Sequence, residues 1–585
     1  MAQSGRNNRS FIIAMFLLVV LAGAAWYLHG PLKVNDGSAV ASATDKGIVT
    51  MIAINDVYRI EGINDGKAGG LSRVAWLRQH AMAKTGAPVP LLHAGDVLSP
   101  SLYSLQGGFN GAEMVDVMNA LDGAPAAFDP YFFTAVGNHE FDKTKCLGKG
   151  LGNFSDRVRE SGFTWLSGNL DYSECEGWAP EGGKGKLADR AIFTVKGMTF
   201  GVFGLTVEFE PGKEAAARKG PQIDGAYIKR ARELTAQLRA EGAEFVIGVT
   251  HLPWACDLKI LKDLENSGPD LIMGGHDHVR MVHTSPENFG DGKNPYRAVY
   301  KASSDATDLA MYDFWRQSDG KIAYSYSARD MDMTAPKSAT IDTLVQDWEA
   351  KLDQKICGAD TGCLDRPVGT TAYPWKLLEH ENRSGETRVG NWYADLMLEA
   401  AKDDGSFCES HQGVVSLINS GTFRLNYDIP TGAQLLDKHV RGVMPYGAKL
   451  SQLCVPGSML HAGLVNGLSA PGAGRYPHIG GMRVSYHRGS DGVAVLDTLA
   501  TTQGDAIKND DTRYLLITAS FLASNSDDGY LFHTVPEGER KALEADLLTI
   551  VPARLGDQAM TPAITPANQR KKELPGQTPS PSCKI

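Results

Sequence analysis

Apolar runs that end abruptly in Asp, Asn or His recur through the first half of the chain. Short apolar runs bounded by turn residues are typical of buried strands. The runs lie at 48–54, 90–93, 131–135, 245–250 and 271–273. Because chemistry in an open sheet gathers at the carboxyl ends of its strands, the polar residues that follow these runs are expected to meet at one site.

Helical periodicity fills the intervals between these runs. Apolar residues recur at three- and four-residue spacing over 71–83, 112–121 and 227–240, which predicts amphipathic helices. Strands that alternate with helices predict an α/β domain whose helices lie outside the sheets. The Gly-rich, polar segment 175–188 is expected to be a surface excursion.

The second half of the chain has a different pattern. A helix over 339–352 is expected to lead into a second domain that combines one helix at 390–401 with short strands and Gly-rich loops. The tail beyond Pro562 has almost no apolar residues, which predicts disorder. The predicted boundaries are 1–46 for an export signal or membrane anchor with its linker, 47–335 for the first domain, 336–365 for the linking helix, 366–556 for the second domain and 557–585 for the disordered tail.

Composition and charge exclude some classes of function. At 585 residues the chain is too long for one ordinary core, and its 43% apolar and 22% charged residues are ordinary for a globular protein. A formal net charge of -10 disfavours a nucleic-acid polymer as partner. The same charge repels a phosphorylated substrate at long range, so metal ions or clustered arginines would have to attract it locally.

The N-terminus has the layout of an export signal. Arg6 and Arg9 precede the apolar stretch 11–27, which contains the small residues 22–25. The stretch is long for a cleaved signal and slightly short for a spanning helix, so a membrane anchor through 11–27 is the alternative. We therefore expect a periplasmic or extracellular protein.

Eight cysteines in an exported chain predict disulfides. Closeness in the sequence suggests the pairs Cys357 with Cys363, Cys146 with Cys175, and Cys408 with Cys454. Cys256 and Cys583 are left over and are not predicted to pair. The CxxC spacing of a structural zinc site does not occur, so the predicted metal centre is not made from thiolates.

The polar residues after the apolar runs form an ordered series of candidate metal ligands. Each fragment alone is more typical of a turn or of a hydrogen-bonded histidine, but the series indicates a metal site. Its members are Asp56, Asp96, Asn138, His251, His276 and His278. Carboxylate, amide and imidazole ligands suit Mn, Fe, Co or Zn.

Two metal ions about 3.5–4 Å apart stabilise both the attacking and the departing oxygen in phosphoryl displacement. One carboxylate must then bridge the two ions. Asp96 is the natural bridge, because its strand is expected to lie between those that bear Asp56 and Asn138.

These motifs resemble those of the calcineurin-like metallophosphoesterases, and more closely those of the 5'-nucleotidase family among them. The motifs are Asp56-Val-Tyr58, Gly95-Asp96, Gly137-Asn-His-Glu140, His251 and Gly275-His-Asp-His278. The resemblance spans roughly residues 47 to 555. It implies a four-layer α/β/β/α metallophosphoesterase domain followed by a smaller α+β substrate-binding domain.

The resemblance also implies roles for the site residues. Two divalent or mixed-valence ions (Mn, Zn, Co or Fe) would be held, one by Asp56, Asp96 and His278, and the other by Asp96, Asn138, His251 and His276. His139 corresponds to the catalytic histidine of the family and Asp142 to the acid that orients it. An ordinary helix N-cap is the alternative for Asp142.

Tyr58 departs from the family pattern, which usually has Asp-x-His at the first motif. A phenol with a pKa near 10 is a poor ligand for a divalent ion, although ferric iron could bind the phenolate. Tyr58 is therefore either a ligand of an iron-preferring site or a neighbour of the site. His278 also differs from the Gln that many 5'-nucleotidases carry at its position.

Five residues of the second domain resemble substrate contacts of the family. Arg383 and Arg424 resemble its phosphate-binding arginines, with surface ion pairs as the alternative. Tyr446 and Phe521 resemble the two aromatics that sandwich the base, with core packing as the alternative. Asp528 resembles the acid that ends the second aromatic loop, although residues 525–527 depart from the family pattern.

The sequence therefore predicts an exported dimetal phosphohydrolase that acts on a small phosphate ester, most simply a 5'-nucleotidase acting in nucleotide catabolism. A cyclic-nucleotide or nucleotide-sugar phosphodiesterase would use the same chemistry on another ester. A non-catalytic nucleotide-binding protein is the alternative from a different class.

Overall fold

The computed structural model describes residues 47–142, 153–173, 185–208, 221–284, 297–402, 408, 410–447, 449–526, 528–575 and 583. In the first domain, one sheet contains β1 (Val49–Ile54), β2 (Leu91–His93), β3 (Phe132–Ala135), β4 (Thr164–Leu166), β6 (Lys186–Ala188), β14 (Asp308–Arg316) and β15 (Ile322–Asp330). The other contains β7 (Arg190–Val195), β8 (Met198–Thr206), β10 (Phe245–His251), β11 (Leu271–Gly274), β12 (Met281–Thr284) and β13 (Ala298–Lys301). The seven strands of the first sheet have the order β15-β14-β1-β2-β3-β4-β6, and the six of the second the order β12-β13-β11-β10-β8-β7.

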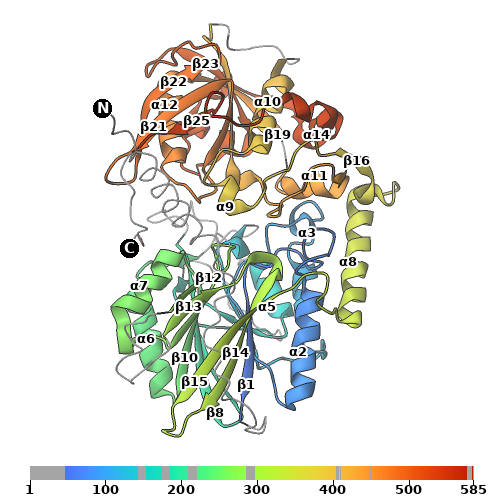
Figure 1. Ribbon diagram of the computed structural model, residues 1–585, viewed down its shortest axis with the longest axis vertical. Helices are drawn as coiled ribbons and strands as arrows, with labels where there is room; N and C mark the ends of the chain where they lie inside the picture. Colours follow the sequence, from blue (N-terminus) through green and yellow to red (C-terminus); the bar gives the residue numbers. More distant parts are fainter. Residues whose placement is uncertain are drawn as a thin grey trace, which may run out of the picture. The chain divides into compact units, whose positions relative to one another are not determined.

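Helices cover the outer face of each sheet (Figure 1). The first sheet is covered by α2 (Leu71–Thr85), α4 (Ala112–Met118) and α5 (Asn153–Glu160), and α8 (Ala339–Cys357) packs against α2 and α4. The second is covered by α6 (Tyr227–Ala240) and α7 (Trp254–Leu264). The result is the expected four-layer α/β/β/α domain.

Strand β1 shows why the sequence folds into these layers. Ile52 and Ile54 pack toward the helices, whereas Met51 and Ala53 pack toward the other sheet. A strand that is buried on both faces is apolar without interruption, which is the pattern visible in the sequence. Strands β1, β2 and β3 are parallel neighbours, and so are β10 and β11, so their carboxyl ends lie at one edge of each sheet.

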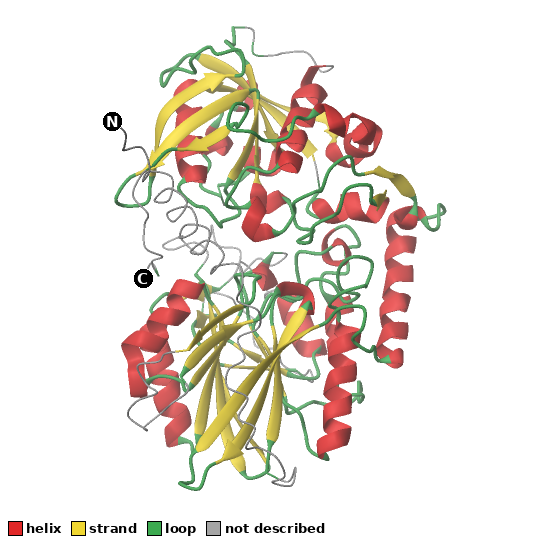
Figure 2. Cartoon of the chain, viewed as in Figure 1, coloured by secondary structure: helices red, strands yellow, loops and turns green. Residues whose placement is uncertain are grey.

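The second domain is built on a five-stranded sheet (Figure 2). Its strands, in spatial order, are β20 (Pro477–Gly480), β17 (Val414–Asn419), β23 (Arg513–Ala519), β19 (Lys449–Pro456) and β24 (Arg540–Asp546). One face packs against α10 (Arg388–Lys402), α11 (Asp437–Val443) and α14 (Leu547–Arg554). The other face packs against α12 (Gly457–Leu468) and a three-stranded sheet of β22 (Ala494–Thr501), β21 (Met482–Arg488) and β25 (Lys571–Glu573).

Short elements complete the two domains. The short α-helices are α3 (Leu102–Leu105), α9 (Glu379–Asn382) and α13 (Ser520–Ser524). The 3-10 helices are η1 (His139–Phe141), η3 (Glu265–Ser267), η5 (Ser304–Ala306), η6 (Cys363–Asp365), η7 (Ser420–Thr422), η8 (Leu531–Thr534), η9 (Glu537–Glu539) and η10 (Leu555–Met560). The short strand pairs are β5 (Leu170–Asp171) with β9 (Gln222–Ile223) and β16 (Pro367–Thr370) with β18 (Gln434–Leu436).

Several predicted boundaries need correction. Helix α8 continues beyond residue 352 to Cys357, and the end of the predicted surface excursion is strand β6. The tail was expected to be disordered from 557, which was wrong: η10 reaches Met560 and β25 pairs in parallel with β21. The composition was misleading because β25 gains order from its ladder hydrogen bonds and from Lys571, which donates to the backbone of Pro477.

The disulfides of the structure agree in part with the pairs predicted from the sequence. The predicted pairs Cys357–Cys363 and Cys408–Cys454 are confirmed, and Cys146 and Cys175 lie outside the described residues. The leftover cysteines, which were not predicted to pair, form a disulfide between α7 and the tail, across 327 residues of sequence. In the part of the chain that the structure describes, no helix has the length and apolar composition to cross a membrane, and residues 11–27 lie outside that part.

Candidate metal centre and substrate site

Sharp backbone turns at the strand ends direct the candidate ligands into one place. Four of these residues, none of them glycine, have a left-handed backbone: Asp56 with φ 51°, Asp96 with φ 59°, His276 with φ 80° and His278 with φ 61°. This conformation costs an L-residue of order 1–3 kcal/mol and is found mainly at functional sites. Four of the six residues that the sequence marked as ligands therefore carry this strain.

Glycines allow the strand-end loops to approach closely. A Cβ atom on Gly137 would lie 2.2 Å from Oδ1 of Asp96, and one on Gly275 would lie 2.4 Å from the carbonyl oxygen of Ala94. A side chain at either position would push the ligand loops apart. The Gly residues of the motifs are thus required by packing.

The first group of ligands is formed by Asp56, Asp96 and His278. Their candidate ligand atoms all lie within 4.8 Å of one another, and the three residues are buried. Nε2 of His278 lies 3.1 Å from Oδ1 of Asp56. Such a set of two carboxylates and one imidazole can hold a divalent cation.

The second group surrounds His251. Its Nε2 lies 3.3 Å from Oδ2 of Asp96, 3.1 Å from Oδ1 of Asn138 and 3.4 Å from Nδ1 of His276. Asp96 belongs to both groups, and its strand β2 lies between β1 and β3. The structure thus brings all six strand-end residues together.

The protonation of this cluster follows from the close spacing of its carboxylates and imidazoles. Nδ1 of His251 lies 2.7 Å from the carbonyl oxygen of Ala94 and donates to it. Burial opposes the charge on His251, but Asp96 and Asp56 raise its pKa to about 9, so the ring is protonated near neutral pH. Burial lowers the pKa of His276 to about 4, which keeps its ring neutral. Burial opposes ionisation of Asp96, but His251 and His139 hold the pKa of Asp96 well below its usual range. A metal ion binds neutral imidazoles and ionised carboxylates, so it would displace a proton from His251.

Tyr58 lies inside the first group. Its hydroxyl is 3.0 Å from Oδ2 of Asp96 and 2.9 Å from Nε2 of His278. Burial, together with Asp96 and Asp56, raises the pKa of Tyr58 well above 10. The hydroxyl therefore keeps its proton in this environment and acts as a hydrogen-bond donor.

His139 and Asp142 form a pair beside the metal ligands. Nδ1 of His139 is 3.0 Å from Oδ2 of Asp142, which leaves Nε2 free to face Nη1 of Arg424 at 3.5 Å. Asp142 also accepts from the hydroxyl of Ser99 at 2.8 Å. Asp142 is the C-cap of η1, and residues 143–152, where a helix capped by Asp142 would begin, lie outside the described residues.

Glu140 was not among the predicted site residues, although it belongs to the Gly-Asn-His-Glu motif. Its buried carboxylate accepts from the backbone N–H groups of Gly137 and Val97, both at 2.6 Å, and of Asp96 at 3.3 Å. It joins the loops after β2 and β3. The position of Glu140 within this motif is the sequence feature that could have identified it as a site residue.

The second domain contributes two arginines and an unexpected carboxylate. Nη2 of Arg383 is 2.8 Å from Oε2 of Glu379, and Nη1 of Arg424 is 3.5 Å from Oε1. The arginine side chains are only 14% and 11% exposed, so the alternative of surface ion pairs was wrong. Glu379 was missed because nothing in its local sequence marks it.

The predicted base-binding residues lie on separate loops of the second domain. Tyr446 is 45% exposed and its hydroxyl donates to Oδ2 of Asp142 at 3.0 Å. Phe521, on α13, is 40% exposed. These exposures exclude the core-packing alternative for both aromatics. Asp528 accepts from Nδ2 of Asn419 at 2.6 Å.

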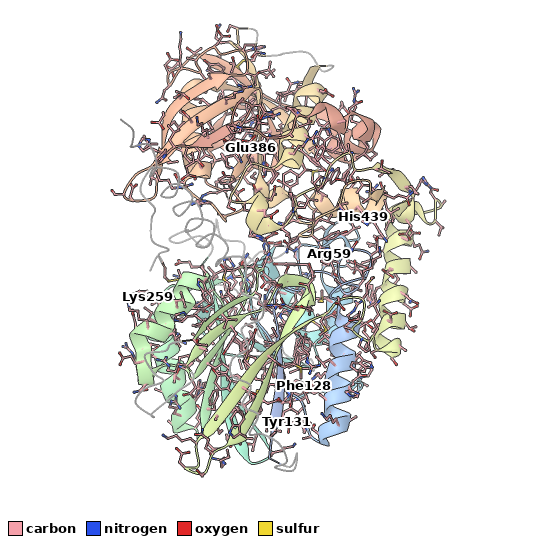
Figure 3. All side chains as sticks on the ribbon, in the orientation of Figure 1. Arg59, Phe128, Tyr131, Lys259, Glu386 and His439 are labelled. Atoms are coloured by element: carbon pink, nitrogen blue, oxygen red, sulfur yellow. A yellow bond between two sulfur atoms is a disulfide. The ribbon has the colours of Figure 1, made fainter. Side chains whose placement is uncertain are left out.

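Further contacts join the two domains. Arg59 lies where the two domains meet (Figure 3). Its Nη1 lies 2.5 Å from Oδ2 of Asp305, and its Nη2 donates to the carbonyl oxygen of Arg424. Nε2 of His439 lies 2.9 Å from Oδ1 of Asp65. The backbone of Arg424 is thereby tied to the loop that carries Tyr58.

Family models and known proteins agree with this arrangement. Residues 49–280 match the model described as calcineurin-like phosphoesterase, and residues 367–535 match the model described as 5'-nucleotidase, C-terminal domain. A trifunctional nucleotide phosphoesterase protein of Bacillus subtilis is 25% identical over 484 residues, which are 77% of this chain but only 30% of that protein.

Solved structures show the same fold. A 5'-nucleotidase precursor from Thermus thermophilus has a TM-score of 0.69 at 20% identity, covering 90% of this chain and 99% of its own. The sulfate thiohydrolase SoxB of Thermus thermophilus has a TM-score of 0.62 at 14% identity, covering 90% of this chain and 97% of its own.

The four-layer fold and the cluster at its strand ends define a calcineurin-like phosphoesterase. Because the 5'-nucleotidase C-terminal domain follows it, the chain belongs to the 5'-nucleotidase family, whose members are metal-dependent hydrolases of phosphate esters.

Proposed function

We propose that this protein is an exported dimetal phosphohydrolase that cleaves nucleoside 5'-phosphates into nucleoside and phosphate. One observation carries the proposal: Arg424 and Tyr446 of the second domain contact the His139–Asp142 pair of the first. A phosphate held by the arginine would therefore lie beside both the histidine and the metal ligands.

The proposed metal ligands divide between two positions. Asp56, Asp96 and His278 would hold one ion, and Asp96, Asn138, His251 and His276 the other. When bound, the two ions supply positive charge to the attacking and departing oxygens. Tyr58 donates to Asp96 and is proposed as a neighbour of the first position.

Side chains of the chain itself would perform the remaining steps. Asp142 orients His139, and Nε2 of His139 stabilises the phosphoryl group or protonates the departing oxygen, because an alkoxide is a poor leaving group. Arg383 and Arg424 bind phosphate oxygens. Tyr446 and Phe521 stack on the base, and Asp528 accepts hydrogen bonds from the organic part of the substrate.

A specific observation favours a second candidate, a phosphodiesterase acting on cyclic nucleotides or nucleotide sugars. Glu379 pairs with both Arg383 and Arg424 and offsets one of their positive charges. A cyclic nucleotide carries one negative charge, and each phosphate of a nucleotide sugar also carries one, so either needs less positive charge per phosphate than the dianion of a monoester. The weak positive charge near the arginines therefore suits a diester.

One panel of substrates tests both candidates. Nucleoside 5'-monophosphates, cyclic nucleotides and nucleotide sugars are incubated with Mn²⁺, Zn²⁺, Co²⁺ or iron, and the released phosphate, nucleoside and nucleoside monophosphate are measured. Phosphate released from monophosphates supports the nucleotidase, and cleavage of diesters alone supports the second candidate. No turnover combined with fewer than two bound metal ions would support a non-catalytic nucleotide-binding protein.

His139→Asn is the control variant for this panel. We expect kcat to fall by about 100- to 10,000-fold, the usual contribution of a general acid, while both metal ions stay bound. The metal ions are retained because neither His139 ring nitrogen belongs to the ligand clusters. Metal analysis of the variant alongside initial rates checks both statements.

The three disulfides of the described residues support a location in the periplasm or outside the cell. Cell fractionation followed by N-terminal sequencing of the isolated protein tests this. A mature N-terminus beyond residue 27 indicates cleavage, and retention of residues 11–27 in a membrane fraction indicates an anchor. A reduced protein in the cytoplasm would contradict export.

A further inference from the structure

Glu379 reaches from the second domain to a metal ligand of the first. Its Oε2 lies 2.7 Å from Nδ1 of His278, and both side chains are only 6% exposed. The other ring nitrogen of His278, Nε2, faces Oδ1 of Asp56 at 3.1 Å. One imidazole therefore connects the first ligand group with a carboxylate of the other domain.

The position of Glu379 is fixed on several sides. Its backbone N–H donates to Oδ1 of Asn426 at 3.0 Å, and Nδ2 of Asn426 donates to the hydroxyl of Ser304, in the first domain, at 2.6 Å. Arg383 holds the carboxylate at 2.8 Å. The carboxylate is thus held against His278 by groups on either side of the domain boundary.

A histidine that binds a metal ion through one ring nitrogen nearly always donates its other ring N–H to a carboxylate or a carbonyl. This partner fixes the tautomer and makes the ligating nitrogen more basic. The first domain supplies such a partner to His251, through the carbonyl oxygen of Ala94. For His278 the carboxylate in the corresponding place is that of Glu379.

We infer that Glu379 is the outer partner of the metal ligand His278, so that the second domain completes a metal position of the first. This inference rests on the ligand set of the proposed function. Glu379 is a positioning residue in this scheme, because it acts through His278. Since the same carboxylate holds Arg383, binding of metal and binding of phosphate would be linked.

An alternative role for Glu379, as an ion-pair partner of a protonated His278, predicts the opposite effect on metal binding. If Glu379 served only as an ion-pair partner of a protonated His278, it would favour the proton over the metal ion at Nε2. Removing its charge would then leave metal binding unchanged or make it tighter. The direction of the change therefore separates the two roles.

The test is Glu379→Gln in the full chain, with the affinity for Mn²⁺ and Zn²⁺ measured by competition with a chromogenic chelator. We expect one of the two bound ions to bind about 10- to 100-fold more weakly, and the other to be unaffected. Glu381→Gln is the matched control, because Glu381 lies on the same short helix, is 40% exposed and pairs only loosely with Lys376, at 3.7 Å. This control should bind both ions as the wild type does.

Melting of the metal-free variant checks that it folds. If Glu379→Gln does not fold, Glu379→Asp takes its place, because the shorter side chain keeps the charge but cannot maintain the 2.7 Å contact. Unchanged binding, tighter binding or equal weakening of both ions would overturn the inference. A wild type that binds no pair of ions would instead overturn the proposed function, and turnover plays no part in this readout.

Discussion

At the scale of single residues, several candidate ligands are oriented by a second group, and Asp56 is an example. Oδ2 of Asp56 accepts from Nδ2 of Asn55 at 2.8 Å and from the backbone N–H of His276 at 2.9 Å. These bonds leave Oδ1 of Asp56 to face His278. Such orientation lets the cluster hold its geometry before any ion or substrate binds.

A variant at Tyr58 tests whether its phenolate is a metal ligand or only a neighbour of the first ligand group. Its hydroxyl already lies near oxygens of Asp96 and Asp56 and near a nitrogen of His278. We expect iron-loaded wild type to lack a visible phenolate-to-metal absorption band, and Tyr58→Phe to keep both metal ions. A band that is present in the wild type and vanishes in Tyr58→Phe would show that the phenolate is a ligand.

Gly137→Ala should disrupt the centre without removing a ligand. The added methyl group would lie 2.2 Å from Oδ1 of Asp96, so the shared carboxylate must move. A shift of about 1 Å in a catalytic group typically costs about 100-fold in rate, and we expect at least this loss in kcat together with weaker metal binding. The control is Gly538→Ala, where nothing lies within 4 Å of the added methyl group. Wild-type metal affinity in Gly137→Ala would contradict the packing argument.

At the scale of elements, the strands were more predictable than the helices. Both faces of β1 are buried, so its apolar run is uninterrupted and clearly bounded. Helix α4 was expected to extend to residue 121 but ends at Met118, and its charged residue Glu113 is only 2% exposed. Periodicity assigns charged positions to the solvent face, so it could not predict this burial.

Glu113 should make stability depend on pH. Burial raises the pKa of Glu113 to about 8, from 4.5 when unfolded. Between these values the folded state keeps a proton that the unfolded state has lost, so the free energy of unfolding falls as pH rises. We expect Glu113→Gln to be more stable than wild type by about 2–4 kcal/mol at pH 8 and similar to it near pH 4.

Urea unfolding of both proteins across this range measures the difference. Glu381→Gln, which removes an exposed carboxylate, is the control and should follow the wild type. A constant difference between Glu113→Gln and wild type at all pH values would show that the titration of Glu113 is not its cause.

At the scale of the whole molecule, contacts between distant segments limited the prediction. The strand-end ligands were predictable because each follows its own strand, and the parallel order of β1, β2 and β3 places them together. Glu379 contacts His278 only because two domains meet, and no local pattern records that. The pairing of β25 with β21 is equally non-local, which is why the tail was expected to be disordered.

The disulfide between Cys256 and Cys583 is a covalent connection between distant segments, and removing it should lower stability more than removing a local one. It closes 327 residues, whereas Cys357–Cys363 closes only 6. Because a disulfide acts mainly by restricting the unfolded chain, we expect Cys256→Ser with Cys583→Ser to lose about 4–5 kcal/mol of unfolding free energy, and Cys357→Ser with Cys363→Ser about 2 kcal/mol. Urea unfolding under non-reducing conditions compares the two double variants. Equal losses would mean that loop closure does not control stability and that local packing around each disulfide does.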